Sequence, residues 1–264
     1  MRRKRHHVTT DPSRAVPREA FLPDVVWVEG GEDGWMRPVS RTADPDGWRE
    51  AVNTDDAIVT QVDDGAADRG FWPTSSFTAL WLTRRVHDAA AIEPGMRVLE
   101  IGTGTGYNAA VMAEAGAHVV SVEIDADLAE HARRALTATG YATGVTVVTG
   151  DGEHGVPRHA PYDRVVATAA VHTVPYTWVN QTRDGGRIIV PYTGPAALGA
   201  LLALDVRDGS AEGRAVAEAA FMPVRGQRLN QNGLPHYEDG AELSVRVDRD
   251  GTHVAGPRTD GIPA

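Results

Sequence analysis

The chain has 264 residues, 42% of them hydrophobic and 23% charged, which suffices for one α/β domain with a sizeable core and short appendages. Its formal net charge of −10 argues against a nucleic-acid partner, because phosphates are held by basic surfaces. The chain contains no cysteine, so disulfides and thiolate chemistry are excluded. It also lacks an apolar run of about 18 residues, so the sequence predicts no membrane span. We therefore expect a cytoplasmic location.

The first elements are short and precede the main domain. Residues 1–14 begin with MRRKRHH, lack an apolar stretch behind these charges, and are expected to form a disordered tail rather than a secretory signal. β-Branched residues predict strands at 25–28 and 57–62, separated by a loop rich in Gly, Asp and Trp. Asp63-Asp64-Gly65 then predicts a turn.

A helix is expected to follow this turn and to run to about Ala91. Ser75 or Ser76 could cap its first turn. One buried face is indicated by apolar residues at helical spacing, which are Ala79, Leu82, Val86 and Ala90.

From residue 94 onward, strands alternate with helices, which predicts a doubly wound, mostly parallel sheet with ligands at the carboxyl ends of its strands. The expected strands are 97–101, 118–124, 145–148, 164–168, 187–190, 200–206, 216–223 and 243–247, and the expected helices are 107–115 and 126–139. We therefore expect one domain at 15–225, with substrate-side elements at 15–93 and a Rossmann-like core at 94–225. Residues 226–264 form an extension without an assigned role.

Three glycines at alternate positions follow the strand at 97–101, in the sequence Gly102-Thr103-Gly104-Thr105-Gly106. Without a Cβ, the main chain can adopt positive φ and approach a nucleotide-like ligand, and the next helix presents free N–H groups. In the dinucleotide fingerprint the third glycine comes one residue later, so this spacing favours S-adenosylmethionine (SAM) over NAD. A tight turn without any ligand is the alternative.

Two acidic residues follow at the ends of the next strands. Glu123, with Ile124 behind it, lies where an acidic residue can accept hydrogen bonds from both ribose hydroxyls. Asp151, in Gly150-Asp151-Gly152, could accept from the exocyclic amine of adenine, although such a sequence also suits an ordinary turn. Asp125 is expected to cap the following helix.

With these residues in place, the chain resembles the protein-L-isoaspartate O-methyltransferase family. The matching segments occur in family order and span about residues 15–225. They are AVPREAF (15–21), VLEIGTGTGYNAAVMA (98–113), VEID (122–125), GDG (150–152), APYDRVVATAA (160–170), DGGRIIVPY (184–192) and FMPV (221–224).

The resemblance implies the class I SAM-dependent methyltransferase fold, SAM as cofactor, and methylation of a peptide carboxylate. It implies that Gly102, Gly104 and Gly106, with the threonines between them, line the cofactor, that Glu123 and Ile124 face the ribose, and that Asp151 and Gly152 face the adenine.

The chain departs from the repair enzymes where they read their substrate. It lacks their Gln-Thr-Ile-Ser segment, and residues 171–175 replace their Ala-Pro-Glu-Ile-Pro. The segments VTQVDDG (59–65) and PYTWVNQTRDGG (175–186) resemble an actinobacterial subgroup that accompanies peptide macrocyclases or lanthipeptide synthetases. This resemblance implies, as the main hypothesis, methylation of an Asp in a ribosomally made peptide and closure of the ester to an aspartimide. Repair of isoaspartyl residues in damaged proteins is the alternative.

A carboxylate acceptor is already ionised at neutral pH, so it needs no general base. Catalysis would then consist of placing the carboxylate oxygen in line with the sulfonium methyl group and excluding water. Hydroxyls could orient the acceptor oxygen, and Thr74, Ser75 and Ser76 are the candidates, with simple helix capping as the alternative. His172, beside Thr173, could contact the substrate or could be a loop residue in solvent.

Two further classes remain open. A dinucleotide-dependent oxidoreductase is disfavoured by the glycine spacing, and a non-catalytic binding module on the same fold is disfavoured by the presence of both Glu123 and Asp151. No metal site is expected, because the ten histidines show no His-Glu-x-x-His spacing.

Overall fold

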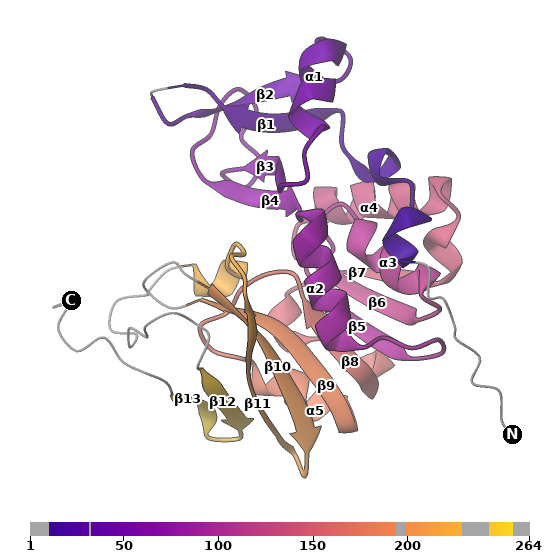
Figure 1. Ribbon diagram of the computed structural model, residues 1–264, viewed down its shortest axis with the longest axis vertical. Helices are drawn as coiled ribbons and strands as arrows, with labels where there is room; N and C mark the ends of the chain where they lie inside the picture. The colour runs from indigo at the N-terminus through magenta and orange to yellow at the C-terminus, as the bar shows by residue number, and fades with distance from the viewer. Residues whose placement is uncertain (1–10, 32, 194–198, 229–242, 256–264) are drawn as a thin grey trace, which may run out of the picture.

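The computed structural model describes residues 11–31, 33–193, 199–228 and 243–255 (Figure 1). Its strands are β1 (Val25–Glu29), β2 (Met36–Ser40), β3 (Ile58–Val62), β4 (Pro73–Phe77), β5 (Arg97–Ile101), β6 (His118–Glu123), β7 (Val145–Thr149), β8 (Tyr162–Ala167), β9 (Thr182–Thr193), β10 (Gly199–Arg207), β11 (Ser210–Glu218), β12 (Ser244–Asp248) and β13 (Gly251–Ala255). Its α-helices are α1 (Pro45–Val52), α2 (Leu80–Ala90), α3 (Tyr107–Glu114), α4 (Ala126–Ala138) and α5 (Tyr176–Gln181). Single 3-10 turns are η1 (Pro12–Arg14), η2 (Arg18–Phe21), η3 (Tyr141–Thr143), η4 (Gly152–His154), η5 (Pro157–His159) and η6 (Arg225–Gln227).

The main sheet has nine strands in the order β13-β12-β11-β10-β9-β8-β5-β6-β7. From β7 to β9, neighbouring strands pair in parallel register, and they correspond to the five strands predicted between residues 97 and 190. β5, β6 and β8, in the middle of this parallel part, are buried over most of their length, because helices cover both sides of the sheet. The alternation of strands and helices predicted from the sequence is therefore confirmed.

The other half of this sheet is antiparallel, so the prediction of a mostly parallel sheet is wrong. β9, β10, β11, β12 and β13 pair in series as antiparallel neighbours. A two-residue turn, Asp208 and Gly209 with φ of 50° and 73°, joins β10 to β11. Such an Asp-Gly pair is typical of a tight hairpin, so the strand expected at 216–223 begins earlier, at Ser210. The strand expected at 243–247 is β12, which places part of the C-terminal extension in the sheet.

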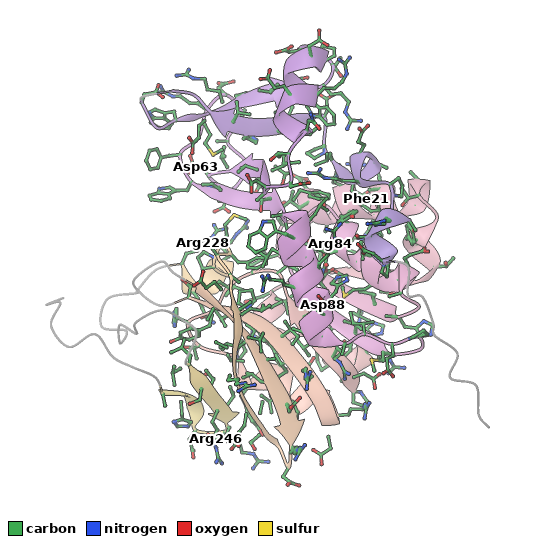
Figure 2. The ribbon with its side chains drawn as sticks, viewed as in Figure 1. Phe21, Asp63, Arg84, Asp88, Arg228 and Arg246 are labelled. Atoms are coloured by element: carbon green, nitrogen blue, oxygen red, sulfur yellow. The ribbon has the colours of Figure 1, made fainter. Side chains whose placement is uncertain are left out.

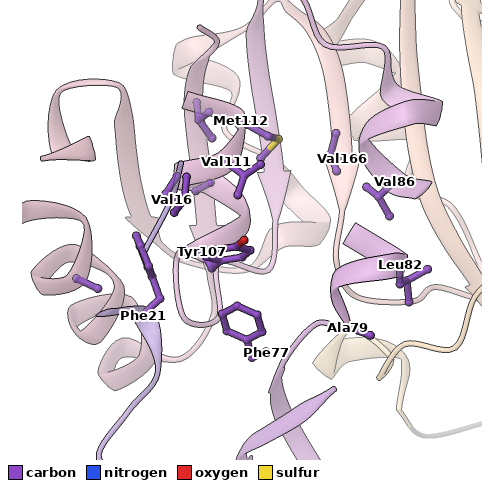
Figure 3. Packing of buried hydrophobic residues seen from close by; sticks show 14 of the residues in the cluster. Val16, Phe21, Phe77, Ala79, Leu82, Val86, Tyr107, Val111, Met112 and Val166 are labelled. Carbon is purple, nitrogen blue, oxygen red and sulfur yellow. The ribbon is translucent and has the colours of Figure 1, made fainter. Parts of the chain in front are cut away.

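Helices enclose the sheet from both sides (Figure 1). Buried residues of α2 and α3, with part of α4, form one apolar cluster with alternate residues of the central strands, and α5 belongs to the second cluster on the opposite face. Figure 3 shows the first cluster near α3, where Phe77 and Phe21 lie beside Tyr107. The ring centroid of Tyr107 lies 4.6 Å from that of Phe77 and 5.8 Å from that of Phe21. This packing attaches the N-terminal elements to the helix that follows the glycine-rich loop.

A second, four-stranded antiparallel sheet is built from the N-terminal elements in the order β2-β1-β3-β4 and lies above one end of the main sheet (Figure 1). Ser75 and Ser76 are not helix caps but residues of β4, where they pair with Gln61 and Val59 of β3. The helix begins only at Leu80. The expectation was wrong because the backbone of this Ser-Ser segment is paired to a neighbouring strand.

The loop expected between the first two strands contains β2 and α1 instead. β2 carries Arg37 and Pro38 at exposed positions, so it lacks the alternation that identifies a strand. Asp44 caps α1 by accepting a hydrogen bond from Gly47 N, and Pro45 occupies the first turn. An Asp followed by Pro is a typical helix start, and it is the signal that would have predicted α1.

Part of the expected tail belongs to the fold. Residues 1–10 lie outside the described residues, but Asp11 forms an ion pair with Arg84 of α2 at 3.1 Å, and the Tyr107 hydroxyl donates to Ser13 O at 3.2 Å. Within the described residues, no helix combines the length and apolar character needed to cross a membrane.

Gly106 places α3 directly against α4. It has φ of +87°, and a Cβ there would lie 3.1 Å from Ala132 Cβ. We expect Gly106→Ala to lower the free energy of unfolding by about 2–4 kcal/mol, through left-handed strain and overpacking together. Gly140→Ala is the matched control, because Gly140 has φ of +84° and nothing within 4 Å of the added Cβ. Urea unfolding measures both, and equal losses would show that the contact with Ala132 imposes no constraint.

Candidate active site

A cleft lies at the carboxyl ends of the central parallel strands. Its walls come from β4, from the loop after β5, from the end of β6, and from the segments that follow β7, β8 and β11. Parallel sheets bind ligands at this edge because the strand ends bring loops from distant parts of the chain together. Most of the site residues predicted from the sequence lie on these walls.

The glycine-rich loop forms one wall. Gly102 and Gly104 have φ of +90° and +52°, and both line the cleft together with Thr103 and Thr105. A Cβ on Gly104 would lie 3.8 Å from the Ser75 hydroxyl oxygen, with no nearer atom in its way. The loop therefore presents bare main chain to the cleft and faces β4 across it.

Glu123 is held at the end of β6 with its carboxylate against the glycine-rich loop. One oxygen, Oε2, accepts a hydrogen bond from Gly104 N at 2.8 Å, and Oε1 accepts from Asp125 N at 3.1 Å. Its side chain is only 6% exposed, and this burial raises the pKa of Glu123 above its ordinary value. Ile124, beside it, exposes its side chain in the same cleft. Asp125 caps α4, as predicted.

Asp151 and Gly152 line the cleft beyond β7. Asp151 also caps η4, because its Oδ1 accepts a hydrogen bond from Glu153 N at 2.9 Å. Asp151 is therefore both a turn residue and a residue of the cleft wall. A Cβ on Gly152 would lie 2.6 Å from Ile101 Cγ2. Only a glycine lets this turn approach the end of β5 so closely.

Thr74, Ser75 and Ser76 line the opposite wall as residues of β4. The Thr60 hydroxyl donates to Ser75 Oγ at 3.0 Å, and the Thr74 hydroxyl donates to Gln61 Oε1 at 2.8 Å. These contacts anchor the hydroxyls on the N-terminal sheet. Ser75 makes no hydrogen-bond donation of its own to another described residue, so its proton is available to a ligand.

Three predicted residues lie outside the walls of this cleft. Gly106 packs against α4, and His172 and Thr173 lie in the loop after β8. The backbone N–H groups of His172 and Thr173 donate to Gln227 Oε1 at 2.9 and 3.1 Å, so this loop is tied to η6. The structure does not bring these three residues together with the others.

Among the wall residues that were not predicted, four have polar side chains that bear on the site. Thr168 donates its hydroxyl to Gly102 O at 2.6 Å and so fixes the glycine-rich loop, and Asn108 lies in the first turn of α3. Arg225 and Arg228 follow directly on the FMPV segment, and among the described residues that line the cleft they alone are cationic. Their position next to a matched segment is the signal that could have identified them.

A buried carboxyl group underlies the cleft. Glu100 is fully buried in β5, and both the Ser121 hydroxyl and Asn108 Nδ2 donate to it. Ser121 and Thr103 share a further hydrogen bond, so the network reaches the glycine-rich loop. Burial raises the pKa of Glu100 to about 7. At the other end, His87 Nε2 lies 2.7 Å from Asn108 Oδ1, and burial lowers the pKa of His87.

Glu100 should make stability fall as pH rises. Its pKa is about 7 in the folded protein against 4.5 when unperturbed, so the folded state binds more protons between these values. Its contribution is fully present below about pH 4.5 and is lost as pH passes 7. Glu100→Gln lacks this titrating group, so its stability should not share this loss. We expect the unfolding free energy of the variant minus that of the unmodified protein to rise by about 2–3 kcal/mol between pH 5 and pH 8. Urea unfolding across this range measures it, and a pH-independent difference would contradict it.

Comparison with known proteins places this chain in a family. The profile of the family "Protein-L-isoaspartate(D-aspartate) O-methyltransferase (PCMT)" matches residues 59–229, a range that runs from β3 to beyond Arg228. The protein-L-isoaspartate O-methyltransferase of Hyperthermus butylicus is 41% identical over 165 residues, which are 59% of this chain and 67% of that protein. Protein-L-isoaspartate O-methyltransferase 2 of a Polaromonas species is 42% identical over 142 residues, 53% of this chain and 67% of that one.

A solved structure of a protein-L-isoaspartate O-methyltransferase matches with a TM-score of 0.63 and 31% identity, over 81% of this chain and 61% of that chain. The fold is therefore that of the class I SAM-dependent methyltransferases, with a mixed main sheet and an added N-terminal antiparallel sheet. The chain belongs to the protein-L-isoaspartate(D-aspartate) O-methyltransferase family and is by this membership a SAM-dependent carboxyl O-methyltransferase.

Proposed function

We propose that the protein transfers the methyl group of SAM to the free carboxylate of an isoaspartyl residue in a peptide or protein. One observation carries the proposal: the Ser75 hydroxyl lies directly beside the bare main chain at Gly104 in the wall of one cleft, with 3.8 Å between the Cβ position of the glycine and that oxygen. A cofactor on the loop and an acceptor on β4 would then lie side by side. The names of the matched relatives support the isoaspartyl carboxylate as acceptor.

The residues present fit SAM. Glu123 offers a carboxylate for paired hydroxyls, and Asp151 offers one for an amine. Ile101, Ile124 and Leu128 provide apolar surface in the same cleft, as an adenine ring requires. When bound, SAM supplies an electrophilic methyl group on a positively charged sulfur.

The protein's own part in the reaction is positioning. An acceptor carboxylate has a pKa near 4 and is ionised at neutral pH, so no residue needs to remove a proton. Ser75 accepts from Thr60, and its own proton can therefore donate to one acceptor oxygen and orient the other toward the methyl group. Ser75 is only 6% exposed, so the wall of the cleft at β4 limits the water that can solvate a nucleophile placed there.

A second candidate is methylation of an Asp side chain in a ribosomally made peptide, followed by aspartimide formation. In that closure the next backbone nitrogen bonds to the ester carbon, the ester C–O bond breaks, and methanol leaves with the amide proton. Phe71 and Trp72 favour it, because they are 44% and 68% exposed and stand directly before the acceptor strand β4. Trp35 extends this aromatic patch, with its ring centroid 5.9 Å from that of Phe71. Such a patch suits one particular peptide rather than damaged proteins in general.

The acceptor is identified by mass spectrometry with SAM and matched peptides that carry isoaspartate or aspartate at one position. We expect the isoaspartyl peptide to gain a methyl group and the aspartyl peptide to remain unchanged. Exclusive reaction of a macrocyclised aspartyl precursor peptide would replace the proposal with the second candidate. That peptide would first gain a methyl group and then lose methanol, which leaves it one water lighter than at the start. In that case Trp72→Ala should raise KM for the precursor. No methylation of either class would overturn both.

Cofactor binding tests the role of Glu123. Glu123→Ala should weaken S-adenosylhomocysteine binding by about 1.5–3 kcal/mol, the range for hydrogen bonds to a charged group. The control is Glu130→Ala, since Glu130 lies half-exposed on α4, where it forms ion pairs with Arg133 and Arg134. Isothermal titration calorimetry measures both variants. Unchanged affinity in Glu123→Ala would show that the cofactor lies elsewhere.

A further inference from the structure

An anionic acceptor must enter the cleft of a protein whose formal net charge is −10. The long-range field therefore repels it, and local cations have to provide the attraction. Among the described residues that line the cleft, these cations are Arg225 of η6 and Arg228, which follows it. Figure 2 shows Arg228 between the two sheets, below the turn that carries Asp63.

Both arginines hold a carboxylate that belongs to the protein itself. Arg228 Nη1 donates to both oxygens of Asp64 at 2.7 Å, and Arg225 Nη2 donates to Asp64 Oδ1 at 2.9 Å. Asp64 lies in the turn after β3 with φ of +53°. Two guanidinium groups on one carboxylate are the arrangement by which proteins bind carboxylate ligands.

Arg225 has unused hydrogen-bonding capacity in this arrangement. Its second ionic contact, with Asp125 Oδ2, is 3.4 Å long, at the limit of a hydrogen bond. Its Nε is buried and has no hydrogen-bond partner among the described residues. A buried N–H without an acceptor is costly, so a ligand oxygen brought into the cleft would stabilise this side chain.

We propose that Arg225 binds the carboxylate of the acceptor peptide and that Asp64 occupies its place when no peptide is bound. Release of Asp64 breaks only the 2.9 Å contact, because Arg228 keeps both of its 2.7 Å contacts with the same carboxylate. The turn at Asp63-Asp64-Gly65 can therefore stay where it is. This inference rests on the proposed function, since it assigns a binding residue for that acceptor.

The exchange also accounts for release of the product. Methyl transfer forms a bond from an acceptor oxygen to the methyl carbon and breaks the bond from that carbon to sulfur, whose electron pair stays on sulfur. The acceptor changes from a carboxylate to an uncharged ester. A neutral ester loses its ionic attraction to Arg225, and Asp64, still held by Arg228, can return.

The test compares Arg225→Gln with Asp64→Asn, using an isoaspartyl peptide as acceptor. We expect Arg225→Gln to raise KM for the peptide by about 10- to 100-fold, the loss of one charge-assisted hydrogen bond, with the Kd of S-adenosylhomocysteine unchanged. Asp64→Asn should change KM in the opposite direction and lower it severalfold, because it removes the competing carboxylate. Arg134→Gln, on the exposed side of α4, is the matched control and should leave both constants unchanged.

Opposite effects separate ligand binding from a structural ion pair. The alternative is that Arg225 only holds the turn at Asp63-Asp64-Gly65 in place. In that case Arg225→Gln and Asp64→Asn will both raise KM, or both weaken S-adenosylhomocysteine binding, and the proposal is overturned. Should Arg225→Gln fail to fold, the direction of the KM change in Asp64→Asn decides alone.

Binding of the isoaspartyl peptide to the protein with S-adenosylhomocysteine separates this inference from the proposed function. A protein that binds the peptide through Arg225 but transfers no methyl group would contradict the function and leave the inference standing. Wild-type KM in Arg225→Gln, with normal turnover, would contradict the inference alone. Absence of both binding and turnover would contradict both.

Discussion

The hydrogen bond from Gly104 N to Glu123 Oε2 is the contact on which the site depends. It joins the glycine-rich loop after β5 to the end of β6, and so fixes the floor of the cleft between two neighbouring parallel strands. Thr168 holds the same loop from the β8 side by donating to Gly102 O. With main chain held from both sides, the loop keeps its positive φ angles without a ligand, and a cofactor meets a preformed surface.

The opposite wall is positioned by apolar packing. Phe77 ends β4 and lies against Tyr107, the first residue of α3, so the strand that carries Ser75 is attached to the helix that follows the glycine-rich loop. The wall at β4 and the wall formed by the glycine-rich loop thus adjoin one buried cluster. A change in this cluster would alter the separation of the two walls, to which in-line transfer is sensitive.

Sequence reasoning was most successful where local pattern and tertiary environment agree. The central strands are apolar because both of their faces are covered, and the loop glycines adopt the positive φ angles for which glycine is suited. It failed at Ser75 and Ser76, because two serines before an apolar run are also typical of a helix start, and only pairing with β3 made them a strand. It could not foresee the contact of Arg225 with Asp64, since these residues are 161 positions apart and no periodicity links them.

The order of the cleft residues along the chain has an evolutionary consequence. The residues proposed for the cofactor come from one uninterrupted stretch between β5 and η4, whereas those on the acceptor side come from β4 before it and from η6 after it. Insertions or replacements in the flanking segments can therefore change the surface proposed for the acceptor while the stretch proposed for the cofactor keeps its sequence. The two parts of the proposed site can be altered separately, so one donor-binding stretch can be combined with different acceptor-binding segments.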